Sequence, residues 1–120
     1  MRLKNVLIVV KDIEVSKTFY KELFGLHVLT DFGQNAILTE GLVLQERASW
    51  EDLIGKEMGP CNHAMELYFE DSDLTAFLRK LEASSYEIQY VTPPMEYYGG
   101  KKVVRFYDPD KHVIEVSEKV

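Results

Sequence analysis

The sequence offers little support for a disulfide, a membrane span or a secretion signal. Its single cysteine, Cys61, cannot form an internal disulfide and matches no metal or redox spacing, so we interpret it as a small apolar filler. The longest apolar run, Val6 to Val10, is far shorter than the roughly 20 residues that a membrane-spanning helix needs. The first residues lack the basic and then apolar layout of a signal peptide. We therefore expect a cytoplasmic protein that has no contact with a membrane.

Positive charge is also scarce and dispersed. The chain has 14 Lys and Arg against 20 Asp and Glu, and its formal net charge is −6. Because the basic residues form no cluster, the charge pattern argues against a nucleic-acid partner. With 120 residues, of which 46% are apolar, the composition is that of one compact globular domain over residues 1–120.

The first half of the chain predicts a strand, a helix and three more strands. Residues 4–10 form a short β-branched apolar run, which indicates a strand buried on both faces. Asp12 is placed to cap a helix whose apolar residues recur every four positions, and Gly25 is placed to end it. Three short extended segments, separated by turn formers, are expected at residues 26–31, 35–39 and 42–46.

The second half repeats this order after a stretch without strand periodicity. We interpret residues 47–61 as a linker, with a possible helical turn at Trp50–Ile54. Residues 64–70 alternate as a strand does, and Ser72 or Asp73 is placed to cap a second helix. Further extended segments are expected at residues 86–91, 102–107 and 113–117, with a long loop around residues 93–100 before the final hairpin.

The spacing of matched residues supports an internal repeat. Asp73 follows Asp12 by 61 residues, and Glu66 follows Asn5 by the same interval. We therefore predict an α+β fold of two tandem βαβββ modules, about residues 1–58 and 59–120. A ferredoxin-like βαββαβ fold is the rival, but it needs fewer strands than the turn signals supply.

Several motifs on this frame resemble those of the vicinal oxygen chelate superfamily, which includes glyoxalase I, extradiol dioxygenases, and fosfomycin and bleomycin resistance proteins. The resemblance spans almost the whole chain. Its carriers are residues 10–20 with 23–26, then Asp73–Phe77 and above all Phe106–Glu115, Phe-Tyr-Asp-Pro-Asp-Lys-His-Val-Ile-Glu. The resemblance implies that the two modules form a half-open, barrel-like cavity for a small-molecule ligand or substrate, and that the protein is a homodimer.

Strand alternation predicts which side chains face this cavity. If Ile114 and Val116 pack under a helix, Glu115 points to the opposite face. The same rule, with the aromatic residues of the second module, gives a set of cavity-lining residues: Asn5, Leu7, Tyr68, Tyr98 and Phe106. The alternative is that the aromatic residues of this set lie in the core or on the dimer surface.

The resemblance also implies a metal site, because metal-dependent members take ligands from the first and last strand of each module. The corresponding residues here are Asn5, Gln45, Glu66 and Glu115. Gln45, Glu66 and Glu115 are the candidate ligands for Zn, Ni, Mn or Fe, and Glu66 and Glu115 are the candidate catalytic residues. Asn5 stands where the family has a histidine, so the alternative is a protein that binds no metal.

Two functions remain open on this basis. The first is a glyoxalase-like, metal-dependent lyase or isomerase that acts on a small oxygen-chelating substrate. The second is a metal-free binding protein of the bleomycin-resistance type, in which Gln45 is a hydrogen-bonding cavity residue. We interpret all three histidines, His27, His63 and His112, as structural or solvated. His63 lies just before a strand and outside the inward register, so only a register slip would bring it to the cavity.

Overall fold

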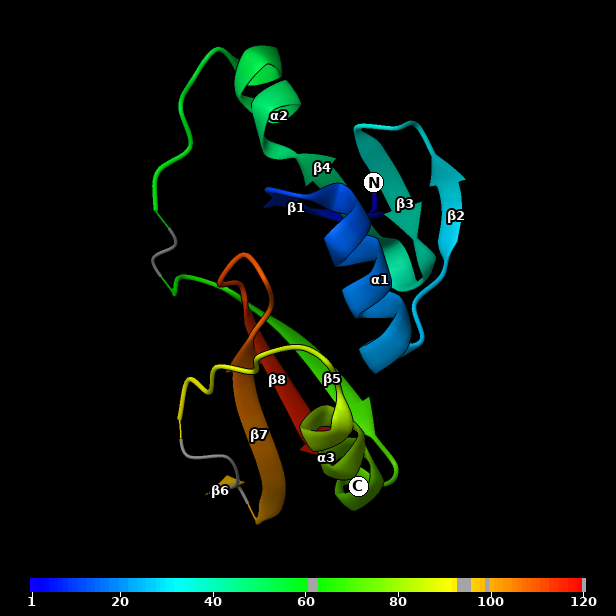
Figure 1. Ribbon diagram of the computed structural model, residues 1–120, viewed down its shortest axis with the longest axis vertical. Helices are drawn as coiled ribbons and strands as arrows, with labels where there is room; N and C mark the ends of the chain where they lie inside the picture. Colours follow the sequence, from blue (N-terminus) through cyan, green and yellow to red (C-terminus); the bar gives the residue numbers. More distant parts are fainter. Residues whose placement is uncertain (61–62, 93–95, 99, 120) are drawn as a thin grey trace. The chain divides into compact units, whose positions relative to one another are not determined.

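The computed structural model describes residues 1–60, 63–92, 96–98 and 100–119, and Cys61 lies outside them. The chain divides into two compact units, unit 1 (residues 1–60) and unit 2 (residues 61–120) (Figure 1). No helix in the described part of the chain is both long and apolar enough to cross a membrane.

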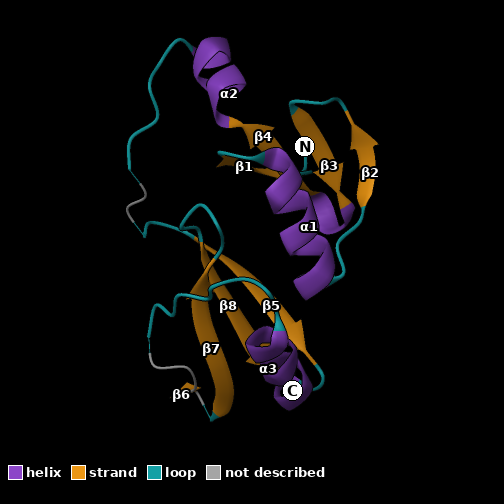
Figure 2. Cartoon of the chain, viewed as in Figure 1, coloured by secondary structure: helices purple, strands orange, loops and turns teal. Residues whose placement is uncertain are grey.

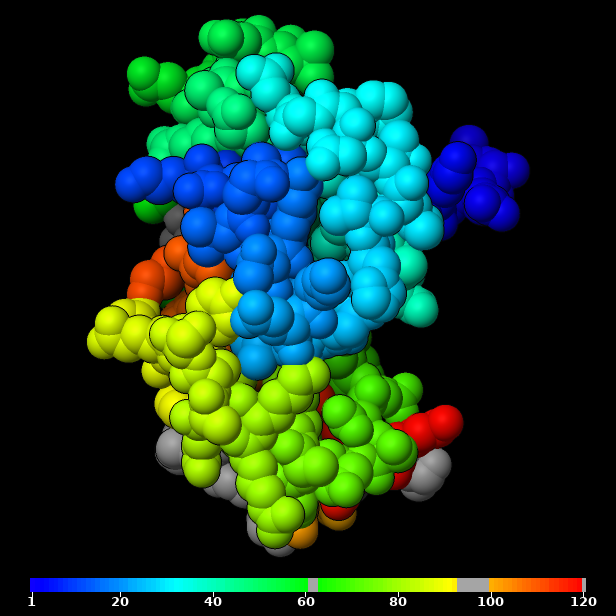
Figure 3. Space-filling view, turned by 45° about the vertical axis from the view of Figure 1, so that its right-hand side comes forward, coloured from blue at the N-terminus to red at the C-terminus, as the bar shows by residue number. Residues whose placement is uncertain are grey.

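Unit 1 is a four-stranded sheet with a helix, α1, packed against it. Its elements are β1 (Val6–Val10), α1 (Ile13–Phe24), β2 (Val28–Asp31), β3 (Asn35–Leu38), the short 3₁₀ turn η1 (Thr39–Gly41), β4 (Leu42–Glu46) and α2 (Arg47–Ile54). The strand order is β1-β4-β3-β2, and β1 runs parallel to β4 while the other pairs are antiparallel. The N-terminal segment, dark blue in Figure 3, projects from this unit.

Unit 2 repeats the same topology. Its elements are β5 (Glu66–Asp71), α3 (Leu74–Ala83), β6 (Glu96–Tyr98), β7 (Lys101–Tyr107) and β8 (Val113–Glu118). The strand order is β5-β8-β7-β6, with β5 parallel to β8. Figure 2 shows the strand, helix and three strands of each unit. The predicted α+β fold of two βαβββ modules is therefore confirmed.

The helix ends lie where the sequence predicts them. The carboxylate of Asp12 accepts hydrogen bonds from the backbone N–H groups of Glu14 and Val15, at 3.1 and 3.2 Å. Gly25 ends α1 in the left-handed conformation, with φ of 68°, which costs glycine little. In unit 2 the Asp73 carboxylate accepts from the N–H of Ala76 at 3.0 Å. These side chains satisfy backbone donors that have no partner inside the helix.

Each core lies between a helix and one face of its sheet. In unit 1, Phe19 and Tyr20 of α1 are almost fully buried and their rings meet edge to face, with centroids 5.1 Å apart. In unit 2, Phe77 of α3 packs on Phe106 of β7, with ring centroids 6.2 Å apart. This places Phe106 on the helix-facing side of its sheet.

Four expectations from the sequence are wrong in detail. β1 is buried on one face only, since Ile8 and Val10 are buried while Leu7 and Val9 are half-buried. Residues 47–54 form a helix, α2, rather than a linker with one turn. Residues 86–91 form only an isolated bridge, Tyr90 to Phe106, and the strand that pairs with β7 is β6, inside the expected loop. Phe106 does not line the face opposite the helix, because alternation along β7 points it toward α3.

Candidate functional site

The face of the unit 2 sheet that points away from α3 carries most of the predicted site residues; we call it the polar face. Strand pairing arranges its side chains in rows, because residues paired across strands point to the same side. One row is Glu66, Val113 and Tyr107, and the next is Tyr68, Glu115 and Arg105. Ile114 and Val116 lie on the other side of β8, where they are almost fully buried, as the predicted register requires.

An ion pair lies in the second row of the polar face. The Nε atom of Arg105 donates to Oε1 of Glu115 at 2.7 Å, and Glu115 as a residue is 7% exposed. A buried carboxylate is stable only with a partner, and Arg105 is that partner. Because the two residues are paired on adjacent antiparallel strands, the sheet itself holds the ion pair in place.

Glu66 is coupled to this ion pair. Loss of solvation raises the pKa of its carboxyl group, and the negative charge of Glu115 raises that pKa further. Arg105 lowers the pKa of Glu66, and a hydrogen bond with Glu115 raises it, with a net shift upward. The two predicted catalytic residues, Glu66 and Glu115, are thus brought together, and Glu66 remains exposed at the surface of unit 2.

A histidine and a tyrosine form a second polar pair in unit 2. The Nε2 atom of His63 lies 2.6 Å from the Oη atom of Tyr107. Tyr107 points to the polar face because it alternates with Phe106 along β7 and pairs with Val113. The register of β5 does not extend to His63, so its contact arises from the segment before the strand.

The residues of unit 1 that correspond to Arg105 and Glu115 are Asn35 and Gln45, and they form a neutral network. The Nδ2 atom of Asn35 donates to Oε1 of Gln45 at 2.8 Å, and Nε2 of Gln45 donates to Oγ of Ser49, also at 2.8 Å. Gln45 is 8% exposed. Both ends of its amide are therefore engaged, and Ser49 belongs to α2, which lies within the stretch that the sequence predicts as a linker.

The remaining predicted cavity residues lie in different surroundings. Asn5 is exposed just before β1, Leu7 is half-buried on the side of β1 away from the core, and Tyr68 is 49% exposed on the polar face. Tyr98 pairs with Lys101 through the backbone, and its side chain lies outside the described part of the structure.

The donor set within each unit falls short of a complete site for a divalent ion. Zinc sites usually have four ligands, or three and a water. Unit 2 supplies the two carboxylates of Glu66 and Glu115, of which Glu115 is paired with Arg105. The described residues contain no group of three or more His, Cys, Asp and Glu side chains that could hold a metal.

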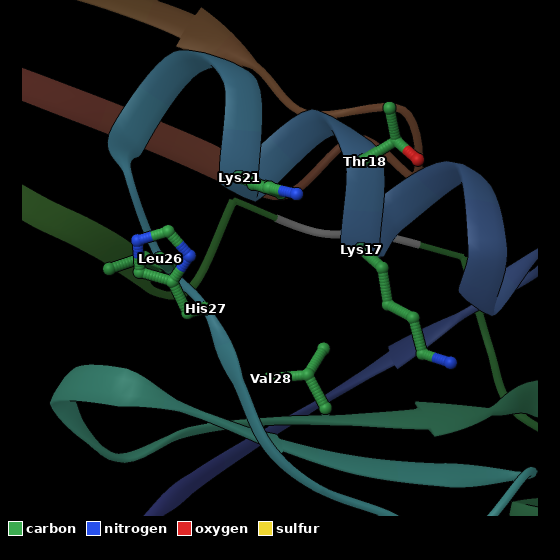
Figure 4. Close-up of a pocket in the computed structure, with 6 residues that line it drawn as sticks. All are labelled: Lys17, Thr18, Lys21, Leu26, His27 and Val28. Atoms are coloured by element: carbon green, nitrogen blue, oxygen red, sulfur yellow. The ribbon is translucent and has the colours of Figure 1, made fainter.

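Unit 1 also has a surface pocket of about 330 Å³, away from the predicted residues (Figure 4). It is lined by Lys17, Thr18, Lys21, Leu26, His27 and Val28. Lys17 does not offer a free charge to a ligand there, because its Nζ atom lies 2.6 Å from carboxylate oxygens of both Glu14 and Asp31. The polar face of unit 2 is therefore the stronger candidate, since its charged groups converge.

The sequence predicts Glu66 and Glu115 as site residues but does not single out Arg105 and Tyr107, which lie beside them on the polar face. The signal was present in the hairpin, because a turn at residues 108–111 places Arg105 opposite Glu115 and sends alternate residues of β7 to the same face. No sequence pattern predicts the contact of His63 with Tyr107, because His63 lies outside any strand and its backbone has a positive φ of 62°.

Comparison with solved structures supports this fold over the full length of the chain. A protein of unknown function from Agrobacterium tumefaciens is 34% identical, with a TM-score of 0.85, and the alignment covers 100% of this chain and 95% of that one. The fosfomycin resistance protein FosX from Listeria monocytogenes is 14% identical, with a TM-score of 0.75 and coverage of 100% and 94%. A lactoylglutathione lyase from Agrobacterium tumefaciens is 20% identical, with a TM-score of 0.72 and coverage of 98% and 92%.

The family comparison covers nearly every residue. No curated protein sequence matches the chain. The model of the glyoxalase-like domain family matches residues 3–120, which include both units and every residue of the polar face described above. Proteins of this family bind small-molecule substrates, commonly use divalent metals and often form dimers. With its duplicated βαβββ fold and this match, the chain belongs to the glyoxalase-like domain family.

Proposed function

We propose that this protein is a lyase or isomerase of the glyoxalase-like family. It removes a proton from, and returns a proton to, a carbon next to a carbonyl group in a small substrate. The observation that supports the proposal is the pair of carboxyl groups on the polar face: Glu115 is paired with Arg105 at 2.7 Å, and Glu66 is hydrogen-bonded to Glu115. Paired carboxyl groups with unequal surroundings are typical of acid–base chemistry, because one stays charged while the other exchanges a proton.

In this proposal Glu66 is the residue that carries the proton. Its raised pKa makes its carboxylate a stronger base than an ordinary glutamate, and its exposure allows a substrate to reach it. Glu115 stays paired with Arg105 and supplies the negative charge that raises the pKa of Glu66. Glu66 takes a proton from the carbon, the electron pair of the C–H bond moves toward the neighbouring carbonyl oxygen, and the proton returns to the same or the adjacent carbon.

Deuterium exchange tests this without knowledge of the natural substrate. The protein is incubated in D₂O with hydroxyacetone, with dihydroxyacetone and with the hemithioacetal of methylglyoxal and glutathione, and deuterium on carbon is followed by NMR. We expect exchange on at least one compound, reduced by about 10²–10⁴-fold in Glu66→Gln. Glu40→Gln, which removes a carboxylate from unit 1, is the control. Equal exchange by Glu66→Gln and Glu40→Gln, or none with the wild type, would contradict the proposal.

A metal-free binding protein is the second candidate. It is favoured by the engagement of the predicted metal ligands, since Glu115 is bonded to Arg105 and Gln45 to Asn35 and Ser49. The measurement is metal content by mass spectrometry after incubation with Zn, Ni, Mn and Fe, on wild type and on Glu66→Gln, Glu115→Gln. Stoichiometric metal that the variant loses supports a metal-dependent enzyme. Absence of bound metal together with absence of deuterium exchange supports the binding protein.

We further propose that the chain forms a homodimer in the cytoplasm, as the family's frequent dimers support. Light scattering tests the first part. A mass near that of one chain, 13.9 kDa, would refute it.

A further inference from the structure

Tyr107 is placed on the same row of the polar face as Glu66. Both residues pair with Val113 of β8, one from each side. Neighbouring strands lie about 4.8 Å apart, so the Cα atoms of Glu66 and Tyr107 are separated by roughly 10 Å. Val113 gives this row an apolar middle, and a small molecule lying over it would have a polar group of the protein on each side.

Two contacts hold the Tyr107 ring. The Nε2 atom of His63 lies 2.6 Å from its Oη atom, with the two rings meeting edge to face at 5.6 Å between centroids. The Nζ atom of Lys111 lies over the Tyr107 ring, 5.2 Å from the centroid, at a distance suited to a cation–π interaction. The phenol oxygen is therefore positioned rather than free to rotate through solvent.

The backbone of His63 gives a second, independent observation. Its φ of 62° lies in the left-handed region, which is unfavourable for a residue with a side chain. Strain of this kind concentrates at functional sites, where the surrounding contacts maintain it. Here the strained residue directs its side chain to Tyr107.

The phenol keeps capacity for one more strong hydrogen bond. When Nε2 of His63 carries the proton and donates it to Tyr107, the O–H of Tyr107 is free to donate to a ligand oxygen. A donor positioned at an oxygen that gains negative charge is the usual way in which proteins stabilise an enolate-type intermediate.

The charges of the polar face select an uncharged ligand. Glu66 and Glu115 carry acidic groups, Arg105 is already paired with Glu115, the Lys111 ammonium lies over the Tyr107 ring, and the chain has a net charge of −6. A carboxylate or phosphate ligand would be repelled by Glu66 and Glu115. A neutral carbonyl compound with a neighbouring hydroxyl group would meet no such repulsion.

We propose that Tyr107, oriented by His63, binds the carbonyl oxygen of a small uncharged hydroxycarbonyl compound while Glu66 takes a proton from the adjacent carbon. This rests on the proposed function. The electron pair of the C–H bond forms a C=C bond, the carbonyl electrons move to its oxygen, and Tyr107 donates a hydrogen bond to that oxygen. The proton then returns from Glu66 to carbon, so that no other reactant is consumed. Tyr107 is a catalytic residue and His63 a positioning residue.

The test compares two tyrosines of unit 2 on opposite faces of its sheet. Tyr107→Phe removes the phenol on the polar face. Tyr90→Phe is the matched control, because Tyr90 bridges to Phe106 and so points to the helix side. Deuterium exchange into hydroxyacetone is measured in D₂O at several concentrations, and His63→Ala and His63→Gln are measured alongside. In parallel, hydroxyacetone and glycolate are titrated while the ring signals of Tyr107 are followed by NMR.

We expect Tyr107→Phe to lower the maximal exchange rate on the order of 10²-fold, with a much smaller change in KM, whereas Tyr90→Phe stays close to wild type. His63→Ala should lower the rate less, and His63→Gln should recover part of it. Hydroxyacetone should shift the Tyr107 signals and glycolate should not.

The outcomes separate this inference from the proposed function. Exchange by the wild type that is equal in Tyr107→Phe and Tyr90→Phe overturns the role of Tyr107 and leaves Glu66 as base. Shifts of Tyr107 signals without exchange overturn the proposed reaction but keep the binding site. Neither exchange nor a Tyr107 shift overturns both, and a stronger response to glycolate overturns the preference for an uncharged ligand.

Discussion

The two units share a topology but differ in charge at one matched pair of positions. In unit 1 Asn35 donates to Gln45 at 2.8 Å, and in unit 2, at positions 70 residues later, Arg105 donates to Glu115 at 2.7 Å. Both pairs join neighbouring antiparallel strands. The same backbone geometry thus holds an uncharged pair in one unit and an ion pair in the other. Only the pair of unit 2 places a second carboxylate beside a neighbouring carboxyl group, that of Glu66, which is why we assign the chemistry to unit 2.

The cores differ at matched positions as well. Phe77 packs on Phe106 in unit 2, whereas the corresponding residues of unit 1 are Ser16 and Ala36, both fully buried. Unit 1 instead places its aromatic residues one turn further along its helix, where Phe19 and Tyr20 lie together. A given fold therefore does not fix where along the helix the large side chains stand, provided that the volume between helix and sheet is filled.

The largest effect is expected from converting the ion pair of unit 2 into the pair of unit 1. Arg105→Asn with Glu115→Gln should keep a hydrogen bond between the strands while lowering the pKa of Glu66, because Glu115 affects that pKa more than Arg105 does. Deuterium exchange should fall, because Glu66 remains but becomes a weaker base, and the loss should be smaller than in Glu66→Gln. The reciprocal change in unit 1, Asn35→Arg with Gln45→Glu, is the control; an equal loss there would remove the distinction between the units.

The next effect concerns the core of unit 2. Phe106→Ala should lower the free energy of unfolding by about 3–5 kcal/mol, because Phe106 is fully buried against Phe77 and its removal leaves a cavity. Urea unfolding followed by circular dichroism measures it. Phe106→Leu, which retains most of the apolar volume, should cost clearly less. A loss near zero in Phe106→Ala would mean that the residue does not lie in the core.

A pH-dependent effect is expected from a His–Asp pair in the hairpin turn of unit 2, because the matched residues of unit 1, Leu38 and Leu42, do not titrate. Nδ1 of His112 lies 2.7 Å from Oδ2 of the buried Asp108. Burial lowers the pKa of His112, but the hydrogen bond to Asp108 and the charges of Asp108 and Asp110 outweigh it, so the pKa is raised. Stability from this pair should be fully present below the unfolded pKa of about 6.5 and be lost as pH rises through the higher folded value.

Urea unfolding at a series of pH values above and below 6.5 measures that loss. In His112→Gln the change over this range should become smaller than in the wild type. Equal pH dependence in the two proteins would assign it to other groups.

The smallest effects should be equal in the two units. Asp12→Ala and Asp73→Ala each remove a helix cap and should each cost about 1 kcal/mol in urea unfolding. Asp12→Asn and Asp73→Asn, which keep an oxygen acceptor, should cost less. A cost confined to one of the two units would show that the matched caps are not equivalent in energy.

Much of the fold could be predicted from the sequence because its signals are local. Asp12, Gly25 and Asp73 mark helix ends through hydrogen bonds to residues nearby in the chain, and β4 and β8 show short apolar runs. β6 could not be predicted, since Glu96–Tyr98 has no apolar alternation and forms its strand only by pairing with β7. Helix α2 was missed for a similar reason: no residue of α2 is buried, so it lacks the apolar face that identifies a helix.

The site was predictable only as far as strand register reached. Alternation in β8 placed Glu115 opposite the buried Ile114 and Val116, and the repeat placed Glu66 beside it. In β7 the face of Phe106 and of Arg105 depends on the pairing with β8, in which Phe106 lies opposite the buried Ile114 and Arg105 opposite Glu115. The contact between His63 and Tyr107 depends on a backbone turn outside the strands, which no periodicity encodes.

The most direct test of the account is the titration of the Glu66 carboxyl group, followed by ¹³C NMR in the wild type and in Glu115→Gln. Central to the account is that the polar face of unit 2 couples two carboxyl groups so that one of them exchanges a proton. We predict that the pKa of Glu66 lies above its ordinary value in the wild type and falls toward that value in Glu115→Gln. An ordinary pKa for Glu66 in both proteins would contradict the account.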